Sequence, residues 1–170
     1  MQSSGAGRRT PVTSTRGCMN RDGLEPEYWR KKPLDGLSRH EWEALCDGCG
    51  KCCLLKLEDE DTGALAYTRI SCRLLDTETC RCGNYALRKQ LVKDCVIVRP
   101  ETLDSIAHWM PGTCAYKLLW QGEDLPDWHP LVTGDPDSTH KLGMSLAGQL
   151  VPEYEVEEDD YQDYTVGGVL

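Results

Sequence analysis

The sequence predicts a small, irregular α+β domain that is mostly helical and organised around cysteine-rich loops. Three observations support this class. The chain has 170 residues, a length that fits one domain. Of these residues 39% are hydrophobic and none is Phe, so one hydrophobic core with few large apolar side chains is expected. It contains ten cysteines, nine of which lie between Cys46 and Cys114. Short helical patterns alternate with one strand-like segment and with loops rich in Gly and Pro.

Three segments are expected along the chain: a disordered leader at 1–25, one domain at 26–152 and an acidic disordered tail at 153–170. The leader is rich in Arg, Ser and Thr and lacks the apolar run of a secretory signal. The tail has seven acidic residues and no Lys or Arg, so it contributes −7 of the net charge of −9. Like-charged runs of this kind are usually solvated. Cys18 lies in the leader and receives no role.

The first element of the domain is a helix at residues 39–45. Ser38 and Glu41 have the spacing of a capping box, in which the Ser side chain and the Glu side chain satisfy each other's backbone amides. Trp42 and Leu45 are three residues apart, so they share one face, which is expected to pack on the domain. The chain then enters residues 46–53, where two glycines permit tight turns. This composition predicts a ligand loop.

The next elements are a polar turn at 58–63 and a short strand at 64–70, predicted from alternating side chains and read as one arm of a hairpin. Three helices follow, at 84–92, 101–110 and 114–120. Pro111 ends the second helix and Gly122 the third. The Pro, Asp and Gly content of 124–139 predicts an irregular loop.

Charge and hydropathy exclude two classes of partner. Residues 34–152 carry a net charge of −6, whereas binding to a phosphate backbone needs clustered Lys and Arg, so nucleic acid is not expected. The apolar runs are only a few residues long, far below the roughly 20 that cross a bilayer, so no membrane partner is expected either. Without a signal sequence, the protein is predicted to be cytoplasmic.

The clustering of the cysteines predicts a metal centre. Cys46-x2-Cys49-x2-Cys52-Cys53 places four thiols within eight residues, and two-residue gaps let a backbone wrap several sulfurs around one centre. A secreted disulfide scaffold would be shorter and would carry a signal peptide. The domain is therefore predicted to be organised around cysteine-rich metal-binding loops. The candidate ligands are Cys46, Cys49, Cys52, Cys53, Cys72, Cys80, Cys82, Cys95 and Cys114.

The spacing leaves the metal open. Cys46-x2-Cys49-x2-Cys52 matches three ligands of a bacterial ferredoxin run, but Lys56 and Leu57 stand where the fourth Cys and the Pro would be. Zinc usually takes paired CxxC knuckles, and the second pair here is the tighter Cys80-x-Cys82. Nine thiols exceed the four ligands of one zinc, so either two centres form, or one cluster forms beside spare cysteines. The cofactor is an iron–sulfur cluster or zinc.

The sequence resembles the YkgJ-type CxxCxxCC family, a zinc- or iron-chelating domain, and in particular its YcgN branch. The resemblance covers about residues 37–151. It is carried by Cys46-Asp-Gly-Cys49-Gly-Lys-Cys52-Cys53-Leu, Cys72-Arg-Leu-Leu, Cys80-Arg-Cys82-Gly-Asn-Tyr, Asp94-Cys95, Pro111-Gly-Thr-Cys114-Ala-Tyr and Asp127-Trp128-His129-Pro130-Leu. It implies a small cytoplasmic bacterial protein with a cysteine-held metal centre. His129 belongs to a shared segment and is considered as an additional ligand.

Three functions fit these patterns. The first is a metal-binding protein whose centre is structural or carries electrons or metal. The second is an iron–sulfur redox enzyme or electron carrier, which would need a substrate or redox partner. The third is a zinc-stapled module whose acidic tail recruits a protein partner. A thioredoxin-like pair is disfavoured because Cys46 follows a helix C-terminus, where the helix dipole does not lower a thiol pKa. Pairing of Cys114 with His108 or His129 as a nucleophile has no support in the spacing.

Overall fold

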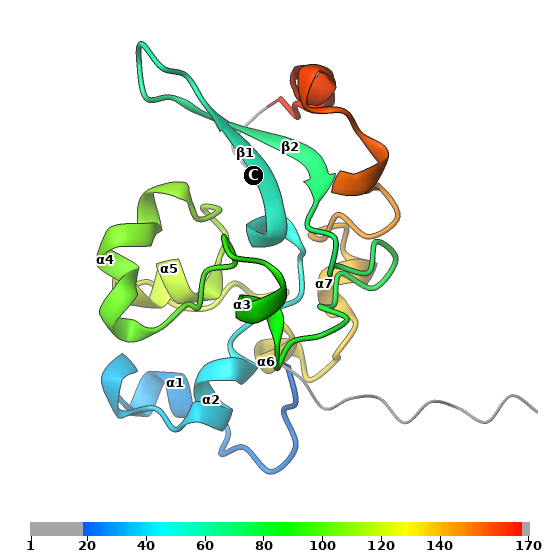
Figure 1. Cartoon of the computed structure of the whole chain (residues 1–170). Coiled ribbons are helices and arrows are strands. Elements are labelled where there is room, and N and C mark those ends of the chain that lie inside the picture. The colour runs from blue at the N-terminus through cyan, green and yellow to red at the C-terminus, as the bar shows by residue number, and fades with distance from the viewer. Residues whose placement is uncertain (1–18, 168–170) are drawn as a thin grey trace, which may run out of the picture.

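The computed structural model describes residues 19–167 and has the predicted α+β class, with short helices and one three-stranded sheet (Figure 1). Residues 1–18, and with them Cys18 and most of the predicted leader, lie outside the described residues. Helices gather on the left of Figure 1, and the hairpin of the sheet stands above them. None of the helices within residues 19–167 has the length and apolar character needed to span a bilayer.

Helix α1 (Tyr28–Lys31) and the 3-10 helix η1 (Leu34–Gly36) precede α2 (Arg39–Ala44). The predicted capping box is present: the amide of Glu41 donates to Ser38 Oγ at 3.2 Å, and the amide of Ser38 donates to Glu41 Oε2 at 2.8 Å. Trp42 and Leu45 are both buried in the helical core, as their shared face predicts. These buried residues hold the C-terminal end of α2 in place, and this fixes the position of Cys46, which follows it.

The sheet is built on the predicted hairpin. After the 3-10 helix η2 (Lys51–Cys53), strand β1 (Leu54–Glu58) pairs antiparallel with β2 (Leu65–Ser71), with Leu57 opposite Ala66. The polar turn between them is closed by Asp59, whose Oδ1 accepts from the amide of Thr62 at 2.8 Å. Strand β3 (Val151–Pro152) adds to β2 in parallel, giving the order β1-β2-β3.

The next helices are shorter than the sequence predicts. The helix expected at 84–92 is only α3 (Arg88–Leu91), because Asn84 Oδ1 accepts from the amide of Leu87 and so offers the backbone a turn instead. In place of the single helix expected at 101–110, three short helices follow one another before Pro111: η3 (Pro100–Thr102), α4 (Leu103–Ile106) and η4 (Ala107–Trp109). Tight 3-10 turns at helix ends are common. Helix α5 (Ala115–Trp120) agrees with its prediction.

The irregular loop expected at 124–139 is wrong in part, since two helices form there: α6 (Pro130–Thr133) and α7 (Ser138–Lys141). Pro130 occupies the first turn of α6, where its missing N–H would have no helical partner anyway. Gly134 ends α6 at a φ of 73°. The same Pro and Gly that suggested a loop therefore mark the start and the end of a helix.

The described part of the acidic segment, residues 153–167, lies against the sheet in this structure. It forms η5 (Glu153–Glu155) and η6 (Glu158–Tyr164), which lie beside β2 in Figure 1. The guanidinium of Arg69 lies over the ring of Tyr164 at 5.4 Å. The amide of Val166 donates to the carbonyl of Tyr67 at 2.8 Å. Residues 168–170 lie outside the described residues.

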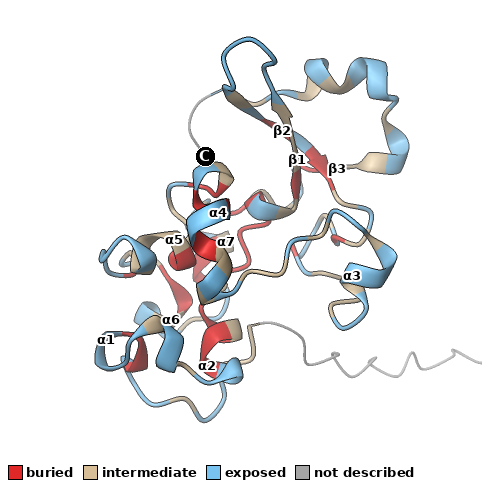
Figure 2. Cartoon of the chain, turned by 60° about the vertical axis from the view of Figure 1, so that its left-hand side comes forward, coloured by how far each residue is buried: buried red, intermediate tan, exposed pale blue. Residues whose placement is uncertain are grey.

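Two apolar clusters make the core. One joins the helices through residues such as Tyr28, Trp42, Leu103 and Tyr116, and the other joins the sheet to the later loops. The second cluster comprises Leu54, Tyr67, Leu75, Cys80 and Leu150. Figure 2 shows buried stretches in both parts, whereas α3 has no buried residue. Members of both clusters line one cavity, which therefore lies between them.

Candidate metal centre

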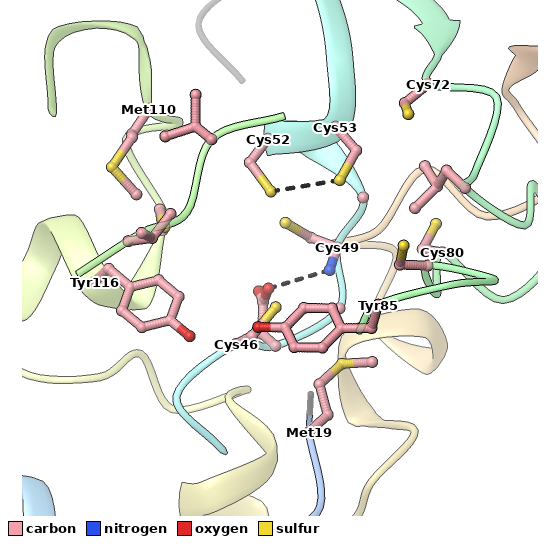
Figure 3. A pocket seen from close by; sticks show the side chains of 18 of the residues that line it. Met19, Cys46, Cys49, Cys52, Cys53, Cys72, Cys80, Tyr85, Met110 and Tyr116 are labelled. Carbon is pink, nitrogen blue, oxygen red and sulfur yellow. Dashed lines mark hydrogen bonds between the residues drawn. The ribbon is translucent and has the colours of Figure 1, made fainter. Parts of the chain in front are cut away.

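All nine cysteines of the described residues line this single cavity, whose volume is about 150 Å³. They come from separate segments: the cysteine loop (residues 46–53), the stretch after β2, the loops around α3 and the turn before α5. Most of the other walls are apolar, with Leu74, Leu75, Val98 and Met110 among them. Free thiols among the cysteines, within residues 19–167, are Cys49, Cys52, Cys53, Cys72, Cys80, Cys82, Cys95 and Cys114. Figure 3 shows the cysteine loop across the middle of the cavity, with Cys72 and Cys80 on one side and Met110 and Tyr116 on the other.

The shape of the cysteine loop depends on its two glycines. Gly48 and Gly50 have φ angles of 75° and 79°, in the left-handed region that other residues seldom adopt. A Cβ added to Gly50 would also lie 2.8 Å from Cys80 Sγ. Gly50 therefore serves both the turn and the approach of a distant thiol.

Hydrogen bonds from distant segments hold the backbone of the cysteine loop. Arg21 donates to the carbonyl of Cys46 at 2.6 Å, and the amide of Cys72 donates to the carbonyl of Cys53 at 3.0 Å. The amide of Leu146 donates to the carbonyl of Cys49 at 3.1 Å. Since these donors come from three parts of the chain, the loop conformation belongs to the tertiary structure and not to the motif alone.

The side chain of His129 holds the residue that precedes the loop. Its ring is fully buried, with Nε2 3.0 Å from the carbonyl of Leu45, while Nδ1 accepts from the amide of Leu131 at 3.1 Å. Burial lowers the pKa of His129 to about 4, so the ring is neutral. Both nitrogens are engaged by backbone, so in this structure His129 positions the loop and is not available as a ligand.

The Sγ atoms of Cys52 and Cys53 lie 3.9 Å apart (Figure 3). Hydrogen bonding from Cys53 lowers the pKa of Cys52, and the same contact raises the pKa of Cys53. Two thiolates on one tetrahedral zinc at about 2.3 Å would lie roughly 3.8 Å apart. The spacing of this pair is thus already that of two ligands on a common metal.

Five further thiols are protonated at neutral pH, since burial raises their pKa values: those of Cys49, Cys72, Cys80, Cys95 and Cys114. Burial raises the pKa of Cys80 to about 11 and that of Cys114 to about 12. Thiolates, and not thiols, bind metals, so metal uptake at this site must release protons.

The chain matches known bacterial proteins along most of its length. A model of the CxxCxxCC family, described as "Putative zinc- or iron-chelating domain", matches residues 45–115. The UPF0260 protein of Rhodobacter capsulatus is 54% identical over 143 residues, which cover 84% of this chain and 95% of that relative. The chain belongs to the UPF0260 family. The UPF0260 protein of Parvibaculum lavamentivorans is 55% identical over 149 residues, 88% of this chain and 96% of that relative.

The comparisons confirm the predicted membership of the CxxCxxCC family. The matched residues 45–115 of this UPF0260 chain contain all nine cysteines of the cavity. The family description supports metal binding and names zinc and iron together. No solved structure matches the chain.

The donor set of the UPF0260 cavity fits a thiophilic metal, but its side chains are not yet gathered around one. Among residues 19–167, no three Cys, His, Asp or Glu side chains converge closely enough to hold a metal ion. Rotation about the single χ1 angle of cysteine moves its sulfur by about 3 Å between staggered positions. All nine cysteines line one cavity, so such rotations change the distances between their sulfur atoms without moving the backbone.

Several residues of the cavity were not expected from the sequence. Met19 lines it from within the predicted leader, and Arg21, also in that stretch, holds the cysteine loop. Asp47, Tyr85 and Arg88 complete the unexpected group. An isolated Arg or Met in a polar stretch carries no periodic signal, whereas Tyr85 could have been noticed, since it directly follows the Cys80-x-Cys82-Gly-Asn segment.

Proposed function

We propose that this protein binds one polynuclear iron–sulfur cluster in the thiol-lined cavity and works as a redox protein of the cytoplasm. The observation that supports this most strongly is that nine cysteines line one cavity of about 150 Å³. A single structural zinc takes four ligands and leaves no further space among them. A cavity of this size with more than twice that number of thiols favours a larger centre.

The ligands proposed first are Cys46, Cys49 and Cys52, which have the two-residue spacing of ferredoxin ligands. The fourth ligand is proposed to be Cys53 or Cys72. Cys53 is supported by its 3.9 Å distance from Cys52, and Cys72 by the hydrogen bond that ties its amide to Cys53. The remaining thiols of the cavity are proposed as ligands of alternative or additional positions.

A bound cluster would supply one-electron chemistry, and the chain's own residues would stabilise its charge. Lys56 lies between the rings of Tyr67 and Trp109, at 5.3 and 4.8 Å from their centroids. Its Nζ donates to the carbonyls of Cys52 and Leu54 at 3.1 and 2.9 Å. This positive charge is therefore held beside the thiol pair, where it offsets the negative charge of thiolate ligands.

The cytoplasmic location is proposed from the state of the thiols. Free thiols share one cavity within residues 19–167: those of Cys49, Cys52, Cys53, Cys72, Cys80, Cys82, Cys95 and Cys114. An oxidising compartment would favour disulfides between such neighbours, while a reducing one keeps them available for metal.

The experiment that tests the proposal is elemental and sulfide analysis of the full chain purified without oxygen, together with its ultraviolet–visible spectrum. Iron and inorganic sulfide in similar amounts, with broad absorbance near about 400 nm that fades on reduction, are expected. Colourless protein with one or two zinc ions would contradict the iron–sulfur proposal and favour the zinc-stapled alternative. Absence of any bound metal would contradict both.

A further inference from the structure

Asp47 is a buried carboxylate with an unused oxygen. Its exposed fraction is only 7%. Oδ1 accepts from the amide of Cys49 at 3.1 Å and so closes the turn of the cysteine loop. Oδ2 has no hydrogen-bond partner among residues 19–167, and Asp47 forms no ion pair within that range. The turn alone does not require the charge, since Asn offers the same acceptor.

Asp47 is one of the residues that line the thiol-lined cavity. The charge of Asp47 acts on thiols from several segments of the chain. Burial is the main cause that raises the pKa values of Cys49, Cys80 and Cys114, and the negative charge of Asp47 raises each of them further. Arg21 forms no ion pair with it within residues 19–167, because its terminal nitrogens donate to the carbonyls of Met19 and Cys46. Burial lowers the pKa of Arg21, and the charge of Asp47 is one of those that partly offset this lowering.

A buried and unpaired carboxylate destabilises a fold unless it is protonated or meets a cation. A metal ion in the cavity is such a cation, and carboxylate oxygen is a ligand for zinc and for transition metals. We propose that Asp47 is a ligand of the metal centre through Oδ2, which makes the centre a mixed sulfur and oxygen site. This inference rests on the proposed function, since it requires metal in the cavity.

The test uses cobalt(II) alone as the probe, added without oxygen to the full-length, metal-free protein. Cobalt(II) reports thiolate ligands by charge-transfer bands and the kind of ligand set by its visible d–d bands. The variants are Asp47→Asn, which keeps the turn acceptor and the side-chain size, and Asp47→Glu, which keeps the charge. Asp76→Asn is the matched control, because Asp76 also accepts in a turn, from the amide of Thr79 at 2.8 Å, but is exposed.

The expected result for Asp47→Asn is cobalt affinity weaker by about tenfold or more, with the same charge-transfer intensity and displaced d–d bands. Asp47→Glu should recover part of the affinity, and Asp76→Asn should match the parent protein. The metal-free Asp47→Asn protein should melt at the same temperature as the parent or higher, since a buried charge has gone. A purely structural role would lower that temperature.

Equal affinity and unchanged d–d bands in Asp47→Asn would overturn the ligand role while leaving the thiol centre intact. X-ray absorption of the cobalt-loaded parent protein covers the case in which the variant does not fold: an all-sulfur ligand shell overturns the inference, and an added oxygen supports it. If the parent protein shows no thiolate charge-transfer bands with cobalt, this inference fails as well, whereas failure of the proposed function is a different outcome, shown by the absence of iron and sulfide in the protein purified without oxygen.

Discussion

The imidazole of His129 lies with Nε2 3.0 Å from the carbonyl oxygen of Leu45, the residue directly before the cysteine loop. The neutral ring donates there, while its other nitrogen accepts from the amide of Leu131 at the start of α6. One buried side chain therefore joins the end of α2 to the beginning of α6. Each of its two hydrogen bonds can be removed separately.

We predict that His129→Asn loses more bound metal than His129→Gln. Asn at a helix N-cap retains an acceptor for Leu131 but cannot reach Leu45, whereas Gln carries an amide donor near the position of Nε2. Both variants should lose roughly 1–3 kcal/mol of unfolding free energy, because each leaves a buried polar group unsatisfied. Urea unfolding and metal analysis measure the two quantities. Equal metal content in the two variants would contradict a role of the Leu45 contact in positioning the loop.

We predict that the free energy of unfolding depends on pH through the protonation of the His129 ring. The folded-state pKa of His129 is lowered to about 4, so the unfolded chain takes up its proton first as pH falls below about 6.5. The stabilisation is present above that pH and is lost as pH falls from about 6.5 to about 4. Between pH 7 and 5 the metal-free parent protein should lose about 2 kcal/mol more than His129→Asn. Parallel urea-unfolding profiles for the two proteins would argue against this.

Cys49→Ser should remove most of the bound metal and lower the melting temperature of the metal-loaded protein by about 5–10 °C, since metal binding contributes to folding. Cys49 is buried in the middle of the cysteine loop. Cys18→Ser is the control, because the leader cysteine has no predicted role, and it should change neither quantity. Full metal content in Cys49→Ser, or metal loss in Cys18→Ser, would show that the ligands were misassigned. Metal analysis and thermal melting check both variants.

Gly50→Ala should destabilise the protein more than Gly122→Ala. Both glycines have left-handed backbones, with φ of 79° and 80°, so both variants lose roughly 1–2 kcal/mol from backbone strain. Only at Gly50 does the new Cβ meet Cys80 Sγ, at 2.8 Å, whereas nothing lies within 4 Å at Gly122. The extra loss should be about 1–3 kcal/mol by urea unfolding of the metal-free protein. Identical losses in the two variants would show that the Cys80 thiol moves aside freely.

The local elements of the fold were predicted well where one residue pattern decides them. Ser38 and Glu41 identified the start of α2, and the alternation of residues 64–70 identified the second arm of the hairpin. The prediction failed where a tertiary contact decides. Helix α6 begins at His129, an uncommon N-cap, and this ring is held there by Leu45, 84 residues away.

In the candidate site, too, the features set by local spacing were predicted from the sequence, whereas those set by tertiary contacts were not. The two-residue spacing of Cys46, Cys49 and Cys52 predicted a metal loop, and family membership is confirmed, while the ligand role of each cysteine remains a prediction. The sequence could not indicate that Arg21 would reach the loop, because a single Arg in a polar stretch looks like any solvated cation. The unpartnered oxygen of Asp47 was equally hidden, since Asp before Gly is a common turn residue.

The hydrogen bond from Leu146 to Cys49 and the contact of His129 with Leu45 have a consequence for biogenesis. A ribosome releases the cysteine loop well before it releases either of these residues. At about 5–20 residues per second, the 84 residues between Leu45 and His129 take several seconds or more to synthesise. The thiols therefore wait without their native support during this time. Assembly of the proposed centre would consequently be a late event, which follows synthesis of nearly the whole chain and requires that the nascent, cysteine-rich segment stay reduced until then.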